Sequence, residues 1–64
     1  MTQKELLYLE DAANHEKSII SIISETLNNL KDEKLISFMK QELEKHNKLK
    51  ENLINMLEVK ANEW

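Results

Sequence analysis

Apolar residues recur every three or four positions in two stretches of this 64-residue chain, and no other feature constrains the fold as strongly. This spacing places the apolar side chains of each stretch along one side of an α-helix. Polar residues interrupt both stripes near the middle. The first stripe is Leu6, Leu9, Ala13, Glu16, Ile20, Ile23, Leu27 and Leu30, and the second is Leu35, Met39, Glu42, His46, Leu49, Leu53 and Met56.

Glycine, proline and cysteine are all absent from the chain. Without glycine and proline, long helices joined by a tight connection are favoured over a fold with many turns. The absence of cysteine excludes disulfides, thiolate metal sites and cysteine nucleophiles. The absence of glycine also excludes glycine-rich loops that bind phosphate groups.

Capping signals predict where the helices begin and end. Thr2 followed by Glu5 matches a capping box at the start of the first helix. Asn28 and Asn29 tolerate the left-handed conformation that ends many helices, and Asp32 can cap the next one. We therefore predict an all-α fold, an antiparallel two-helix hairpin in one domain over residues 1–64, with helices over about 3–28 and 33–61 and a turn over about 29–32.

The apolar face of each helix is wider than one antiparallel partner can cover. Two hairpins packed into a four-helix bundle would cover it, so we predict a homodimer or a higher even oligomer. The alternative is a hairpin that docks on a different partner protein. The predicted interface residues are Leu6, Leu9, Ile19, Ile20, Ile22, Ile23, Leu27, Met39, Leu43, Leu49, Leu53 and Met56.

The interrupting polar residues should form one layer inside the hairpin. Glu16 and His46 each lie fifteen residues from Lys31, near the expected turn, so they should lie at the same level. Glu42 lies one helical turn nearer the connection, and His15 points toward the edge of the apolar face. A twofold dimer would bring two such layers together.

Two interpretations of this layer stay open. In one, Glu16 and His46 form a buried ion pair or hydrogen bond, while Glu42 reaches Lys45 or solvent. In the other, Glu16, Glu42 and His46, with His15 nearby, bind Fe, Mn or Zn, as in carboxylate bundles that carry a Glu-x-x-His motif. Here three residues, instead of two, separate Glu42 from His46.

Charge and hydropathy exclude several classes of partner. The formal net charge is −3, and no run of basic residues fits a nucleic-acid backbone. The longest apolar run, Leu6 to Leu9, is far shorter than the ~20 residues that span a bilayer. The first residues do not resemble a secretory signal. We therefore expect a soluble, intracellular protein that binds neither nucleic acid nor membrane.

The segment from Glu5 to Asp11, followed by His15 and Glu16, resembles the helical repeat of the coat F family of bacterial spore coat proteins. Phe38-Met39, the segment from Glu42 to His46 and the terminal Trp64 add to this resemblance. It implies ferritin-like helical bundling and a structural role in the spore coat, with other coat proteins as further partners.

Together these observations predict a structural, non-enzymatic protein that associates with itself and needs no cofactor. The first alternative is a small di-metal carboxylate protein with Fe, Mn or Zn at the polar layer. The second is a regulatory hairpin that docks on a partner bundle.

Overall fold

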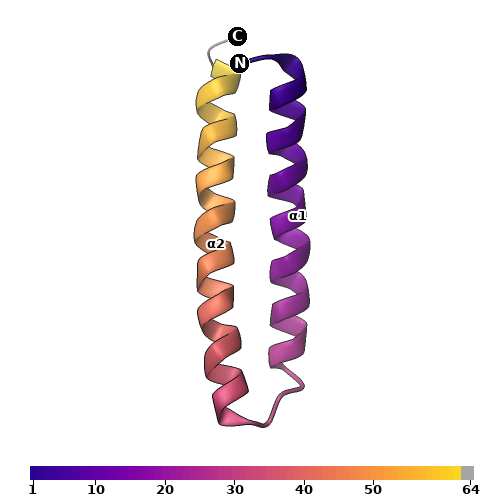
Figure 1. Ribbon diagram of the computed structural model, residues 1–64, viewed down its shortest axis with the longest axis vertical. Coiled ribbons are helices and arrows are strands. Elements are labelled where there is room, and N and C mark those ends of the chain that lie inside the picture. Colours follow the sequence, from indigo (N-terminus) through magenta and orange to yellow (C-terminus); the bar gives the residue numbers. More distant parts are fainter. Residues whose placement is uncertain (63–64) are drawn as a thin grey trace.

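The computed structural model describes residues 1–62, with side chains for residues 1–60. It contains two α-helices, α1 over Gln3–Leu27 and α2 over Glu33–Asn62. The helices run side by side in opposite directions and form an all-helical hairpin measuring 48 × 14 × 12 Å (Figure 1). The hairpin predicted from the sequence is therefore present. Trp64 lies outside the described residues.

The predicted capping box begins α1. The Thr2 side-chain oxygen accepts a hydrogen bond of 3.1 Å from the Glu5 backbone N–H, and the Thr2 backbone N–H donates one of 3.0 Å to Glu5 Oε1. These bonds satisfy two donors that have no partner within the helix. The backbone N–H of Thr2, and after it the Thr2 side chain, hold the pKa of the Glu5 carboxyl below its ordinary value of 4.5.

The end of α1 differs from the sequence-based expectation. Asn28 is the C-cap, but its backbone is right-handed helical, with φ −66° and ψ −18°. No residue in the described part of the chain has a positive φ. The helix ends instead through backbone bonds of 3.0 Å from Asn29 to Thr26 and 3.4 Å from Leu30 to Leu27, and the Asn29 side chain caps the Glu25 carbonyl. The predicted left-handed termination is thus wrong, because tightened final turns satisfy the terminal carbonyls without it.

The start of α2 agrees with the sequence. The Asp32 carboxylate accepts hydrogen bonds from the backbone N–H groups of Lys34 and Leu35, at 2.9 and 3.1 Å. Its negative charge also lies beside the positive end of the helix dipole. Asp32 is therefore the N-terminal cap that its position predicted.

Side chains from both helices meet in a narrow seam. Every member of the first predicted stripe is buried or half-buried, and Ala13, Glu16 and Ile23 are the most enclosed, at 3%, 8% and 6% exposure. No described side chain is fully buried. The seam is thus one layer of side chains deep, as expected where only two helices meet.

The seam on α2 differs from the predicted second stripe. Leu35, Leu49 and Met56 were expected in the core, but they are 51%, 44% and 45% exposed. The half-buried residues that alternate at spacings of three and four are Ile36, Met39, Leu43, His46, Lys50, Leu53, Leu57 and Lys60. Because this series contains Lys50 and Lys60, it is less apolar in sequence toward the end of α2 than the predicted second stripe. A lysine can lay its aliphatic stem along an apolar seam and keep its amino group in water.

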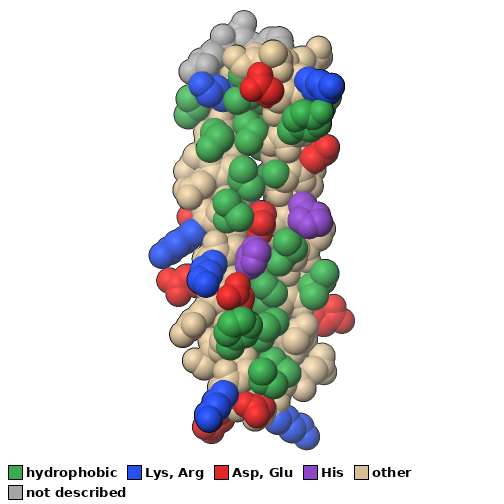
Figure 2. All heavy atoms as spheres, in the orientation of Figure 1, with side chains coloured by type: hydrophobic (Ala, Val, Ile, Leu, Met, Phe, Trp, Pro, Cys, Tyr) green, Lys and Arg blue, Asp and Glu red, His purple; other side chains and the backbone are tan. Residues whose placement is uncertain are grey.

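Large apolar side chains remain exposed along one side of the hairpin. We define the exposed apolar face by Tyr8 and Ile22 on α1 and by Phe38, Leu49 and Met56 on α2, which are between 44% and 63% exposed. The spacings of seven, eleven and fourteen residues keep each set on one side of its helix. Tyr8 and Met56 also line one hollow near the open end. Figure 2 shows apolar side chains gathered over both helices on this face.

No helix in the described part of the chain is long and apolar enough to cross a membrane.

Candidate functional site

A polar layer crosses the seam near the middle of both helices. We define it by Glu16 on α1 and by Glu42 and His46 on α2. Glu16 is buried, whereas the side chains of Glu42 and His46 each retain 27% of their exposure. All three residues come together, as their spacing from the turn predicted.

Glu16 and His46 form the central contact of the layer. His46 Nδ1 lies 2.5 Å from Glu16 Oε2. A carboxylate can only accept a hydrogen bond, so with Glu16 ionised we assign the bridging hydrogen to Nδ1. In the neutral imidazole this leaves the lone pair on Nε2, the ring nitrogen on the opposite side. The contact therefore fixes the ring orientation, and for an ionised Glu16 beside a neutral His46 it favours the tautomer with the hydrogen on Nδ1.

Glu42 completes the layer from within α2. Its Oε2 lies 3.9 Å from His46 Nε2, and its Oε1 lies 3.5 Å from Lys45 Nζ. These contacts match the first interpretation, in which Glu16 and His46 form an ion pair or hydrogen bond and Glu42 reaches Lys45. Among the described residues, no buried side-chain nitrogen or oxygen lacks a hydrogen-bond partner. The layer is thus compatible with a folded hairpin as it stands.

His15 stands apart from the Glu16–His46 contact. It is exposed, and it lies seven residues from both Tyr8 and Ile22, in the α1 row of the exposed apolar face. Figure 2 shows both histidines of the chain on this face. Its predicted place at the edge of the apolar face agrees with the structure.

A single hairpin presents few free metal donors. Among the described residues, no group of three or more histidine and carboxylate side chains is arranged to hold a metal ion. Glu16 Oε2 is already bonded to His46 Nδ1, which leaves His46 Nε2 and the Glu42 carboxylate as the adjacent donors of the layer. One hairpin therefore places the imidazole of His46 and the carboxylate of Glu42 side by side, at 3.9 Å.

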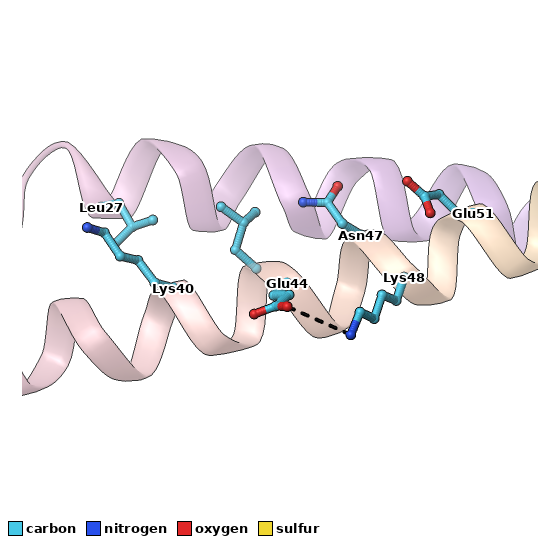
Figure 3. A pocket seen from close by; sticks show the side chains of 7 residues that line it. Leu27, Lys40, Glu44, Asn47, Lys48 and Glu51 are labelled. Atoms are coloured by element: carbon cyan, nitrogen blue, oxygen red, sulfur yellow. Dashed lines mark ion pairs between the residues drawn. The ribbon is translucent and has the colours of Figure 1, made fainter.

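The opposite side of the hairpin is polar. A shallow hollow of about 590 Å³ lies there, lined mainly by α2 residues with Leu27 from α1 (Figure 3). Lys48 Nζ lies 3.7 Å from Glu44 Oε1, the pairing that their spacing predicts. Both side chains are more than 70% exposed, so this pair contributes little to stability. The arrangement is that of a solvated surface.

The predicted interface residues divide into two groups. Most pack within the hairpin itself, and Ile22, Leu49 and Met56 lie outside it on the exposed apolar face. Tyr8 and Phe38 are absent from the predicted interface residues, although the sequence places both on the wide apolar faces of their helices, and both are exposed on the same side of the hairpin. The signal for Tyr8 is its seven-residue spacing from His15 and fourteen-residue spacing from Ile22. The corresponding signal for Phe38 is its position one helical turn before Glu42, on the same side of α2.

Comparisons with protein-family models, with curated proteins and with solved structures found no match to this chain. The resemblance to coat F proteins therefore stays a prediction.

Proposed function

We propose that this chain is a structural, non-enzymatic module that associates with a second copy of itself through the exposed apolar face. Two hairpins joined in this way make a four-helix bundle. The observation that carries the proposal is the row of large apolar side chains along one side of a hairpin with a very small core.

The surface area of the hairpin supports this association. The accessible surface is 5103 Å². A compact monomer of 7.6 kDa exposes about 4,300 Å². The excess of about 800 Å² reflects the elongated shape of the hairpin and is similar in size to the area that each partner buries in a standard protein interface.

The distribution of polar residues indicates which side associates. Opposite the exposed apolar face, the surface carries charged residues such as Lys40, Glu44, Lys48 and Glu51. The hairpin thus has one charged, solvent-exposed side and one apolar side, as expected for half of a four-helix bundle. A second copy fits because a twofold axis sets the same apolar face against itself.

The test is the molecular mass in solution, measured by sedimentation equilibrium for the wild type and two matched variants. We expect a dimer for the wild type and for Leu7→Lys, because Leu7 is 55% exposed but lies away from the exposed apolar face. Leu49→Lys should weaken dimerisation at least about 100-fold, since two leucines would lose roughly 1.5 kcal/mol each of apolar burial.

A wild type that stays monomeric at millimolar concentration would overturn the proposal. Equal weakening by Leu7→Lys and Leu49→Lys would place the interface elsewhere. A monomer that forms a defined complex with a different helical protein would favour the regulatory hairpin instead.

The cellular setting is a separate proposal, supported only by the resemblance of residues 5–11 and of His15-Glu16 to coat F proteins. It places the module in the spore coat, with other coat proteins as partners. Detection of the chain in the coat fraction of spores from its source organism tests this setting.

A further inference from the structure

Glu42 and His46 form a polar centre within the exposed apolar face. Along α2 they lie between Phe38 on one side and Leu49 and Met56 on the other. Glu42 falls four residues after Phe38 and seven before Leu49, so it shares their side of α2. If this face is an interface between two copies, as proposed above, the interface contains carboxylates and imidazoles at its middle. The chemistry of that centre therefore deepens the proposed function and rests on it.

His46 is prepared as a metal ligand. Its Nδ1 is held by Glu16 at 2.5 Å, which leaves the Nε2 lone pair free in the neutral imidazole. Histidine ligands in metalloproteins commonly donate their other ring N–H to a carboxylate, which orients the ring and raises its basicity. Glu16 supplies this support from α1, where it is only 8% exposed.

Glu42 provides a second donor beside the first. The distance of 3.9 Å between Glu42 Oε2 and His46 Nε2 compares with about 3.3 Å for two ligands around a tetrahedral zinc ion. The spacing of four residues on one helix keeps both side chains on the same side. Glu42 also retains 27% of its side-chain exposure, so a small torsional change can bring its carboxylate to a shared ion.

Two donors do not complete a zinc site, but the position of the layer supplies the others. Glu16 and His46 lie near the middle of their helices, fourteenth of 25 residues in α1 and fourteenth of 30 in α2. Two hairpins that overlap along their full length with their long axes parallel therefore bring the His46 levels together, and they also bring together the Glu42 levels one helical turn away. The second copy then contributes the same two donors.

We propose that two copies of this chain share one Zn²⁺ ion at the centre of their interface, bound by His46 Nε2 and one Glu42 carboxylate oxygen from each copy. Glu16 is a positioning residue and does not touch the metal. Two imidazoles and two carboxylates form a four-coordinate donor set suited to zinc. The two Glu42 charges balance the charge of the ion itself, and each Glu16 carboxylate is compensated by the hydrogen bond that it accepts from His46 Nδ1.

The experiment combines zinc titration with sedimentation equilibrium on the intact chain. Zinc chloride is added in competition with a chromophoric chelator, and the mass is measured with and without zinc. We expect one Zn²⁺ per two chains. Free Zn²⁺ at 100 times its Kd should tighten the dimer about 100-fold, because the ion binds only the associated state. Co²⁺ in its place should give the visible absorption of a four-coordinate site.

Matched variants identify the ligands. Glu42→Gln and His46→Gln should abolish binding at this stoichiometry, whereas the control Glu44→Gln, exposed on the polar side, should bind as the wild type does. Glu16→Gln should keep the stoichiometry but weaken zinc binding about 10- to 100-fold, because it alters the support of a ligand. Circular dichroism confirms that each variant remains helical. Glu42→Gln tests the site even where His46→Gln disturbs the seam.

The outcomes separate the two proposals. A dimer that binds no zinc overturns the shared site and leaves self-association standing. A chain that is monomeric with and without zinc overturns both. Zinc binding that survives Glu42→Gln and His46→Gln, or that is lost equally in Glu44→Gln, overturns the ligand assignment.

Discussion

Glu16 on α1 and His46 on α2 are thirty residues apart in the chain, yet Oε2 of the carboxylate lies 2.5 Å from Nδ1 of the imidazole. The contact is a polar interaction inside an otherwise largely apolar seam. It satisfies a nearly buried carboxylate that would otherwise lose its hydration without compensation.

Breaking this pair from one side should cost more than replacing both partners. His46→Leu leaves Glu16 without its partner, and we expect it to lower the free energy of unfolding by about 1–3 kcal/mol. Glu16→Leu combined with His46→Leu should regain most of that loss, because two apolar groups fill the same space. Urea unfolding at one fixed protein concentration measures both. A double variant that is less stable than His46→Leu would contradict this account.

The Asp32 cap should be worth a measurable part of the stability. Asp32→Ala removes the acceptor for two backbone N–H groups at the start of α2, and we expect a loss of about 0.5–2 kcal/mol. The control is Asp11→Ala, an exposed position inside α1, where we expect a change within about 0.5 kcal/mol. Thermal and urea unfolding of both variants make the comparison. Equal losses would mean that the cap contributes nothing specific.

The capping box should weaken in acid. The pKa of Glu5 is lower in the folded chain than its ordinary value of 4.5, chiefly because the Thr2 backbone N–H donates to the carboxylate. A group with a lowered folded pKa stabilises the fold fully above its unfolded pKa, and that contribution disappears as the pH falls through the folded pKa. Titration of Glu5 by NMR should give a pKa below 4.5. Thr2→Ala removes the hydroxyl and keeps the backbone N–H, so it should raise this pKa only part of the way to 4.5, and Thr2→Ser should leave it unchanged. A wild-type Glu5 pKa of 4.5 or above, or a return to 4.5 in Thr2→Ala, would contradict the assignment.

The position of Lys50 in the seam is also testable. Lys50 is half-buried on the side of α2 that faces α1, so Lys50→Leu should increase the free energy of unfolding by about 1 kcal/mol through added apolar burial. Lys48→Leu, on the polar side, should give no such gain. If the seam followed Leu35, Leu49 and Met56 instead, the two lysine variants would behave alike. Urea unfolding distinguishes these cases.

The predictable parts of this fold are those determined by local chemistry. Thr2, Glu5 and Asp32 act through bonds to neighbouring backbone groups, so their roles follow from short sequence spacing. The level of Glu16 and His46 follows from the hairpin turn, because equal distances from the turn bring residues opposite one another. These features depend little on side-chain packing.

The side of α2 that meets α1 could not be predicted in the same way. The predicted stripe and the observed seam share Met39, His46 and Leu53, and helical spacing alone fits both series. In the folded chain, the series that contains Lys50 packs against α1, because the aliphatic stem of Lys50 can cover apolar surface. The site shows the same division. The contact between Glu16 and His46 was predictable, whereas the orientation of Glu42 toward both Lys45 and His46 required the three-dimensional arrangement.

The polar layer also gives the alignment of the two helices a single solution. Because the seam repeats every seven residues, sliding α2 by one repeat would again set apolar side chains against apolar side chains. Such a slip would place Met39 or Leu53 opposite Glu16 and leave a buried carboxylate without a donor. That penalty, about 1–3 kcal/mol for each unsatisfied group, applies to slipped alignments and not to the native one. The layer therefore fixes the register of α2 along α1, which the leucines and isoleucines of the seam alone would not fix.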